Sequence, residues 1–458
     1  MPNQSPQPRI KSHVTLGFCT LLHAFTHAYC VALVPLYLMI VSDLKLSGVR
    51  AASLIVTIYG LIYCIGSYAA GVLADRFNRK LLLGVGLIGN AIAIAAMGIT
   101  RQYEMLIVLG AVAGMFGTIF HPSANALVPA HYPKHPGMVI GILGMGAGFG
   151  FFFGPQYAGW RAQTAGWHWG MIADWQRPCI ELGAIGIIVG VLFLIFASEP
   201  RKTRKPRSAD EQAEDGVLPN RVAIEAIVTE LRTEHARQHP KLTWDTRRKI
   251  IKVASLLMFR DFAGIASLSL LSIYLQKAHG YSTKQAGFVV GAMMLLMSIV
   301  VNPLSVWISP GKRRLPTLSG VLIIGGLILL AVPMLPVSWV LPVMCVFQAF
   351  QMGSYAVSDA AVLERVSPAI RGRVVGLFLT LAGTFASLSP WAVGYWTDLL
   401  RDRAREPHAY LPIFATLSAM MWIASSASPL IARLGESVAA KPQAAPLTPT
   451  VATMEPAR

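Results

Sequence analysis

Residues 71–80 read Gly71-Val72-Leu73-Ala74-Asp75-Arg76-Phe77-Asn78-Arg79-Lys80, a charged turn between two apolar stretches. Gly71 has no side chain and lets two helices approach closely. Asp75 stands at a helix end, where a carboxylate can accept hydrogen bonds from the N-terminus of a neighbouring helix, while Arg76 and Arg79 can reach acids or lipid headgroups. The stretch therefore predicts two membrane helices joined by a short turn that contacts another part of the protein.

The apolar character of the flanking stretches extends over most of the chain. Of its 458 residues, 54% are hydrophobic and only 13% are charged, whereas soluble domains carry about 25% charged residues. This composition excludes a disordered protein, a secreted disulfide scaffold and an ordinary cytosolic enzyme. A membrane-spanning helix needs about 20 mostly apolar residues. Twelve stretches qualify: 15–41, 49–74, 81–99, 105–128, 138–159, 178–197, 251–276, 285–308, 316–334, 339–362, 372–397 and 410–432.

The basic residues predict how these helices are oriented. Most Lys and Arg residues fall on the side that holds the N-terminus, including those at 76–80 and 312–314. This positive-inside bias places both termini and the central loop in the cytoplasm, so the net charge of +17 indicates topology and not a nucleic-acid partner. The expected organisation is a cytoplasmic segment 1–14, a six-helix bundle 15–197, a cytoplasmic loop 198–250 with an amphipathic helix, a second bundle 251–432 and a disordered cytoplasmic tail 433–458.

An internal repeat relates the two bundles. At an offset of 235 residues, six positions of 137–159 match 372–394, among them Gly148 with Gly383 and Pro155 with Pro390. At an offset of 237, Tyr37 matches Tyr274. An even number of spans separates the copies, so both face the same way. The pattern predicts a parallel repeat about an axis along the membrane normal.

With this repeat, residues 71–80 resemble the G-x-L-A-D-R-x-G-R-K signature of the major facilitator superfamily, and the likeness covers essentially the whole membrane portion. Asn78 replaces the usual glycine, and asparagine tolerates a left-handed backbone better than most residues. The resemblance implies twelve helices in two pseudo-symmetric six-helix bundles. It also implies that Gly71, Asp75, Arg76, Arg79 and Lys80 form a cytoplasmic latch, closed when the protein faces outward.

The fifth span carries a second pattern of small residues. Gly141, Gly150, Gly154, Pro155 and Gly159 are similar to the antiporter motif of drug exporters in the superfamily. Glycines permit close helix packing, and a proline removes one backbone hydrogen bond and bends its helix. The alternative is a close-packed helix with no bearing on transport direction.

The fourth span contributes a further likeness. Its glycines and the sequence Phe120-His121-Pro122 resemble the fosmidomycin-resistance-like branch of the superfamily. His121 and Pro122 are interpreted as a helix-bending element. The arginine that drug exporters place in this span is absent, as is their acidic residue in the first span.

Titratable residues inside the membrane are candidates for function, because burying them there costs several kcal/mol. His23 and His27 are four residues apart and therefore share one helix face. A rise of about 1.5 Å per residue places both at about the middle of the membrane. The 237 offset maps His23 onto Arg260, which also lies at mid-depth. We therefore expect substrate contacts from His23, His27, Arg260 and Gln351.

Arg260 has a planar, permanently charged fork suited to an anionic substrate. The alternative is an internal ion pair with Asp261 or Asp359, although adjacent residues point about 100° apart on a helix, which makes Asp261 a poor direct partner. His23 and His27 are the first candidates for proton coupling, with Asp261 and Asp359 as rivals. Packing roles for the two histidines stay open.

These features predict a secondary transporter in the cell inner membrane that moves a small polar or anionic organic solute by alternating access. Proton-coupled efflux is the leading hypothesis, and proton-coupled uptake of an organic anion or metabolite is the alternative. A sensor or scaffold derived from a transporter is the third. No P-loop, HExxH, GxSxG or CxxC pattern occurs, so we expect no enzyme activity, catalytic residues, cofactor or metal site. The expected partners are the solute, protons and the bilayer, with the chain as a monomer.

Overall fold

The computed structural model describes residues 9–164, 172–200, 244–296, 313–366 and 371–439. Within these residues, the regular structure of the N-terminal half consists entirely of helices. Long apolar runs form helices because a bilayer core leaves every backbone polar group to be satisfied within its own segment. The elements of this half are α1 (Arg9–Val31), η1 (Val34–Leu36), α2 (Tyr37–Asp43), α3 (Val49–Arg76), α4 (Arg79–Met97), α5 (Tyr103–Gly117), α6 (Phe120–His131), α7 (Pro136–Ala162) and α8 (Gln176–Phe196).

The C-terminal half repeats this plan. Its elements are α11 (Trp244–Ala278), α12 (Thr283–Leu296), α14 (Arg314–Ala331), η5 (Val332–Met334), α15 (Val337–Leu363), α16 (Arg371–Ser387), α17 (Ser389–Leu399), η7 (Arg401–Arg405), η8 (Pro407–Tyr410), α18 (Leu411–Ser425) and α19 (Ala427–Ala439). Helix α1 packs on α7 in the first half, and α11 packs on α16 and α17 in the second. The first and fifth spans of each half are thus neighbours, as the repeat predicts.

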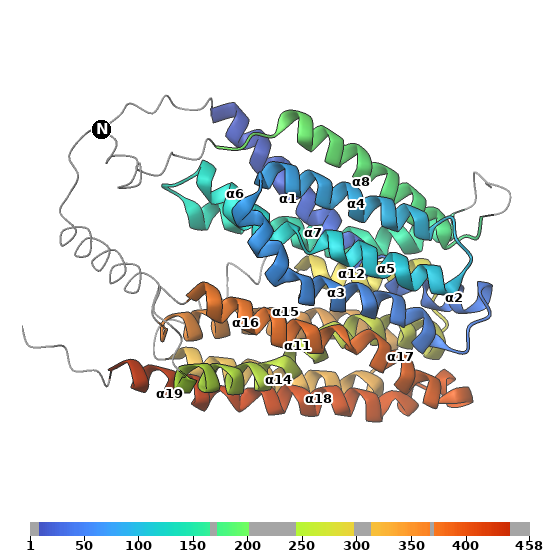
Figure 1. Ribbon diagram of the computed structural model, residues 1–458. Coiled ribbons are helices and arrows are strands. Elements are labelled where there is room, and N and C mark those ends of the chain that lie inside the picture. The colour runs from blue at the N-terminus through green and yellow to red at the C-terminus, as the bar shows by residue number, and fades with distance from the viewer. Residues whose placement is uncertain (1–8, 165–171, 201–243, 297–312, 367–370, 440–458) are drawn as a thin grey trace, which may run out of the picture.

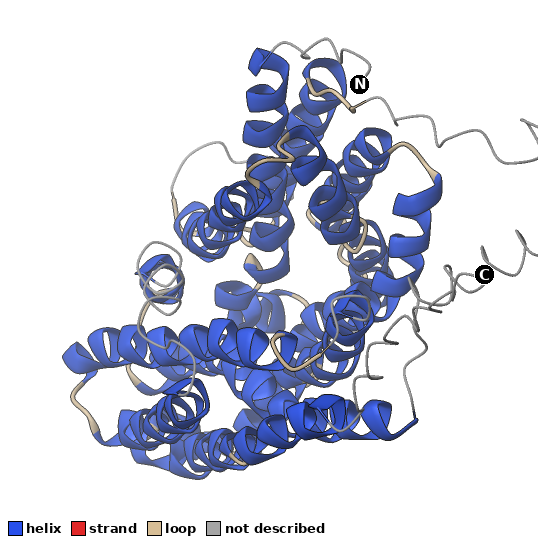
Figure 2. Cartoon of the chain, turned by 90° about the vertical axis from the view of Figure 1, so that its left-hand side faces the viewer, coloured by secondary structure: helices blue, strands red, loops and turns tan. Residues whose placement is uncertain are grey.

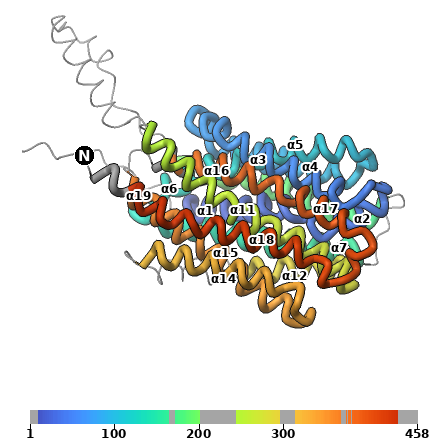
Figure 3. The backbone as a smooth tube through the Cα atoms, turned by 90° about the horizontal axis from the view of Figure 1, so that it is seen from below, coloured from blue at the N-terminus to red at the C-terminus, as the bar shows by residue number. Residues whose placement is uncertain are grey.

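The two halves form two layers of helices that run roughly side by side (Figure 1). Figure 2 shows the same two groups end-on, and Figure 3 shows the C-terminal half in front. Within the described residues, eleven helices are long and apolar enough to cross a membrane. The predicted span 285–308 is represented by α12 as far as Leu296, and the remainder lies outside the described residues.

Several boundaries differ from the sequence expectation. The first, fourth, eleventh and twelfth spans are each interrupted, at residues 32–33, 118–119, 388 and 426. Pro35 and Pro390 sit in the first turn of the elements that follow two of these interruptions, where a missing N–H costs nothing. The first helix starts at Arg9 and the last ends at Ala439, beyond the predicted limits of 15 and 432. The amphipathic helix predicted in 198–250 falls outside the described residues.

The halves are bonded to each other at the end of the molecule opposite the start of α1 (Figure 1). Asp398 at the end of α17 accepts hydrogen bonds from the first backbone amides of α3, with its two carboxylate oxygens 2.8 Å from the Val49 nitrogen and 3.0 Å from the Arg50 nitrogen. Gln276 of α11 donates to the Pro35 carbonyl oxygen at 3.1 Å. A carboxylate on a helix N-terminus satisfies unpaired amides and meets the positive end of the helix dipole.

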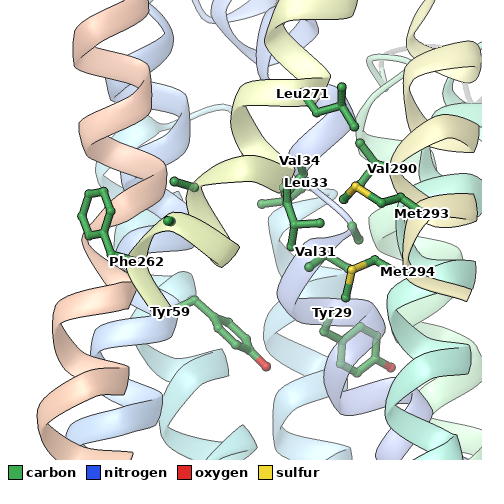
Figure 4. Close-up of a cluster of buried hydrophobic side chains, with 14 of the residues drawn as sticks. Tyr29, Val31, Leu33, Val34, Tyr59, Phe262, Leu271, Val290, Met293 and Met294 are labelled. Carbon is green, nitrogen blue, oxygen red and sulfur yellow. The ribbon is translucent and has the colours of Figure 1, made fainter. Parts of the chain in front are cut away.

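An apolar contact closes the same region. Val31 and Val34 of the first half lie beside Val290, Met293 and Met294 of the second, all of them buried (Figure 4). Helix α7 packs along α12, and α3 packs along α16 and α17. Three helix pairs and this apolar contact therefore join the halves.

Candidate functional site

The first candidate cluster is positioned by unusually close packing of α1 on α7. A side chain at Gly150 would lie 2.9 Å from the Ala24 carbonyl carbon, and one at Gly154 would lie 2.8 Å from the Ala28 Cα atom. Gly146 likewise faces Thr20 and the Cβ atom of His23. Glycines at every fourth position thus form a groove on α7 that receives the backbone of α1. Gly150 and Gly154 belong to the motif singled out in the sequence; Gly146 does not.

His23 and His27 meet in this region, as their spacing on α1 predicts. Their Nε2 atoms are 3.1 Å apart. The Nδ1 atom of the buried His23 lies 2.7 Å from the Leu143 carbonyl oxygen of α7, which fixes a proton on that nitrogen.

His121 of α6 joins the pair. Its ring centroid lies 5.0 Å from that of His23 and 5.7 Å from that of His27. The sequence predicts that His121 and Pro122 bend their helix, and the fourth span is interrupted just before them, between the end of α5 and the start of α6. The sequence did not predict that His121 lies beside α1.

Aromatic rings hold the three imidazoles in place. Phe120 stacks on His23 with 4.6 Å between centroids, and Phe151 lies 4.5 Å from His27. The Tyr63 ring meets His121 edge-on at 6.2 Å. The Tyr63 hydroxyl is buried and has no hydrogen-bond partner among the described residues.

The second cluster surrounds Arg260 on α11, in the other half. Arg260 is only 3% exposed. Its Nε atom lies 2.7 Å from an Asp261 carboxylate oxygen, its Nη1 atom donates to the Ser358 hydroxyl at 2.9 Å, and its guanidinium lies over the Tyr355 ring at 3.8 Å. The argument that Asp261 is a poor partner is therefore wrong: the long arginine side chain folds back and overcomes the angular separation.

Gln351 and Asp359 of α15 complete this cluster. Gln351 is fully buried, and its Nε2 atom donates to the Arg260 carbonyl oxygen at 2.9 Å. Gly264 makes room for it, because a side chain there would lie 2.9 Å from the Gln351 Cδ atom. Asp359 is exposed and forms no ion pair with a described residue. Gln351 thus shapes the backbone near Arg260, and Asp359 is the carboxylate left available.

Half of the residues of the 71–80 turn are exposed. Asp75 and Arg76 are open to solvent, and the backbone amides of Arg79 and Lys80 donate to the Glu199 carboxylate at 3.2 Å. Asn78 adopts an extended backbone, not a left-handed one, and its side-chain oxygen accepts from the Leu81 amide at 2.8 Å. Asparagine is suited to this position as the N-cap of α4.

The remaining motif glycines have different surroundings. Gly71 and Gly141 have nothing within 4 Å of where a side chain would begin. Gly159 instead faces the Thr283 backbone of α12 in the other half, with an added Cβ atom 2.6 Å from its carbonyl oxygen, and Gly287 of α12 packs on Pro155. The motif therefore serves one contact within the first half and one between the halves.

A cavity of about 730 Å³ also lies between α7 and α12. Tyr157, Trp160 and Lys284 are among the residues that line it. None of the predicted site residues lines this cavity, so it is separate from both clusters.

Comparison with curated proteins finds partial likeness to drug-resistance proteins. The chain is 32% identical to the multidrug resistance protein MdtG of Dickeya zeae (strain Ech586) over 177 residues, which are 38% of this chain and 41% of that protein. It is 29% identical to the tetracenomycin C resistance and export protein of Streptomyces glaucescens over 155 residues, 33% of this chain and 27% of that protein. The matches thus span less than half of each relative.

Solved structures share the fold over nearly the whole chain. A bacterial homologue of the human lysosomal transporter Spinster, in an inward-facing and unoccupied conformation, has a TM-score of 0.69 at 16% identity and covers 94% of this chain and 98% of its own. A mutant of the nucleoside transporter NupG has a TM-score of 0.66 at 12% identity and covers 91% and 99%. The family model described as Major Facilitator Superfamily matches residues 16–390. The chain, a multi-pass membrane protein, therefore belongs to the Major Facilitator Superfamily of secondary transporters.

Proposed function

We propose that the protein exports a small polar or anionic organic solute across the cell inner membrane in exchange for protons. The observation that carries this proposal is the buried Arg260, which has two nearby carboxylates, Asp261 on α11 and Asp359 on α15. A buried Arg–carboxylate pair is a site where a substrate anion or a proton can change the balance of charge. The drug-export names of the partial relatives support efflux over uptake.

Export is tested in everted membrane vesicles from a strain that overexpresses the chain. Tetracenomycin C, named for one relative, is the first compound to try, followed by a panel of toxic organic anions. We expect accumulation that requires an imposed proton gradient. Accumulation in right-side-out vesicles instead would favour the uptake alternative, and the absence of counterflow for every compound would favour a sensor or scaffold.

With both termini in the cytoplasm, as the basic residues predict, the joined end of the structure faces outward, and we infer that this is the inward-facing state of the transport cycle. The exposed Asp75 and Arg76 then represent the open form of the proposed cytoplasmic latch. They engage the second half only when the transporter faces outward.

Asp75→Asn is expected to lower transport several-fold while expression and melting temperature stay near wild type, because the carboxylate is exposed here and contributes little to this state. The measurement is initial efflux rate per folded protein. Asp402→Asn, an exposed carboxylate outside the 71–80 turn, serves as the matched control. Wild-type rates in Asp75→Asn would rule out the latch.

Asp359 is the proposed proton carrier, since Asp261 is already paired with Arg260. Asp359→Asn should lose proton-driven accumulation and retain exchange of labelled for unlabelled solute, which needs no proton. Both are measured in proteoliposomes, with the exposed Asp402→Asn as control. Proton-driven accumulation by Asp359→Asn would exclude this assignment. Coupling through His23 and His27 stays a prediction.

A further inference from the structure

We propose that His23, His27 and His121 form a binding site for a divalent transition-metal ion of the zinc class. One ring nitrogen from each histidine lies within 4.8 Å of those of the other two. The three come from two separate helices, α1 and α6, so the cluster is a product of the tertiary fold. The inference concerns ion binding and is independent of the direction or substrate of transport.

The spacing of the nitrogens fits a shared ion. Tetrahedral ligands at Zn–N distances of about 2.0–2.1 Å lie about 3.3 Å from one another. The His23 and His27 Nε2 atoms are 3.1 Å apart. The ring nitrogen of His121 has to move toward the other two by about 1.5 Å at most to reach the same ligand spacing. His121 lies at the start of α6, next to the interruption that separates α6 from α5.

The arrangement of the rings gives a second measure. Three imidazoles on one tetrahedral ion place their centroids about 5 Å apart, because each centroid lies beyond its nitrogen on the metal–ligand line. The observed separations are 4.8, 5.0 and 5.7 Å. Aromatic packing alone also gives such separations, but it does not require the nitrogens to converge.

The surroundings of the cluster have the features of a ligand shell. The Leu143 carbonyl oxygen lies 2.7 Å from the His23 Nδ1 atom, so the Nε2 lone pair faces the cluster. Metal-bound histidines almost always donate their other N–H in this way. His121 has no hydrogen bond with a described residue, and the buried Tyr63 hydroxyl beside it is also without a partner. Three protein ligands leave a fourth position for a water, to which this hydroxyl could bond.

The ligand type limits which ion the site accepts. Neutral imidazoles suit Zn²⁺, Co²⁺, Ni²⁺ and Cu²⁺, whereas Mg²⁺ and Ca²⁺ prefer oxygen ligands. The group contains no carboxylate, so it does not neutralise the ion. His27 and His121 are partly exposed while His23 is buried. We therefore expect an ion that exchanges with solution.

The test is a titration with Co²⁺, whose visible absorption reports coordination geometry. The full chain is purified in detergent with a tag that contains no histidine, and is stripped with a chelator. We expect one Co²⁺ per chain with tetrahedral-type bands, displaced by Zn²⁺ and unaffected by Mg²⁺. His121→Ala and His27→Ala should each weaken binding at least tenfold, as expected for loss of one of three ligands, and His408→Ala, outside the cluster, should leave it unchanged.

Two results would overturn the proposal: a wild-type chain without the Co²⁺ bands, or a His23→Ala/His27→Ala/His121→Ala chain that binds Co²⁺ as tightly as wild type. Since a variant can fail to fold, melting temperatures without metal are compared first. If the variants are unfolded, the test is made on the wild-type chain alone. We then expect Zn²⁺ to protect three histidines from carbethoxylation, and peptide mass should identify them as residues 23, 27 and 121. Protection of other histidines instead would reject the site.

Discussion

Arg260→Ala is expected to reduce transport to background and to lower the melting temperature of the purified protein. The substitution leaves the Asp261 carboxylate, 14% exposed, without the cation that lies 2.7 Å away. It also removes the donor to Ser358 and the cation over Tyr355. Breaking a buried ion pair by removing one partner costs about 3–5 kcal/mol. Efflux in vesicles and thermal melting in detergent measure the two effects.

Companion variants separate a substrate contact from charge balance. Arg260→Lys keeps the charge and loses the planar fork, so apparent affinity should fall while some transport remains. Arg260→Ala with Asp261→Asn removes the uncompensated charge and should recover most of the melting temperature, but no transport. Wild-type transport by this double variant would mean that Arg260 serves only to neutralise Asp261.

Gly150→Ala is expected to lower transport at least about tenfold and to destabilise the first half, because overpacking of this kind costs about 1–3 kcal/mol. The added methyl group would lie 2.9 Å from the Ala24 carbonyl carbon and 3.0 Å from the Ala24 Cα atom. These are backbone atoms, so only a displacement of α1 can relieve the contact, and α1 carries His23 and His27. Thermal melting and efflux rate are measured on the same preparation.

The chain supplies a matched control in the same helix. Gly141 has nothing within 4 Å of a new Cβ atom. Alanine is about 1 kcal/mol more favourable than glycine within a helix, so Gly141→Ala should melt at or above the wild-type temperature. Equal melting temperatures for Gly150→Ala and Gly141→Ala would contradict the close α1–α7 contact.

Hydropathy and the repeat were sufficient to predict the fold, since a bilayer restricts the chain to helices of about 20 residues. Residue counting predicts similar depths for His23 and Arg260 but not their partners. The contact of Arg260 with Asp261 depends on how a flexible side chain folds back, which helix geometry alone does not determine. The spacing of His23 and His27 predicted a shared face, and the structure places their nitrogens together.

The position of His121 beside α1 is a second feature that the sequence could not predict. Its closeness to His23 depends on where α5 ends and on the angle at which α6 continues, and neither is encoded in hydrophobic periodicity. Gly146 and Gly264 were missed for a different reason. A glycine acquires meaning only from the backbone or side chain that it faces, here Thr20 and Gln351. The four-residue spacing of Gly146, Gly150 and Gly154 was the available signal.

Helix α3 has a carboxylate at each end. Its first backbone amides donate to Asp398, and its last turn bears Asp75, which is exposed in this structure and is proposed to contact the second half when the transporter faces outward. On the proposed mechanism the two contacts belong to opposite states. The difference between their free energies therefore contributes to the equilibrium between the inward-facing and outward-facing forms. Hydrogen bonds to a charged group contribute about 1.5–3 kcal/mol, so loss of either contact would shift the ratio of the states by about 10- to 150-fold. Weakening both contacts together would leave that ratio nearly unchanged and would speed the interconversion of the two states. The turnover rate, and not the conformational preference, is therefore the property most sensitive to the summed free energy of the two contacts.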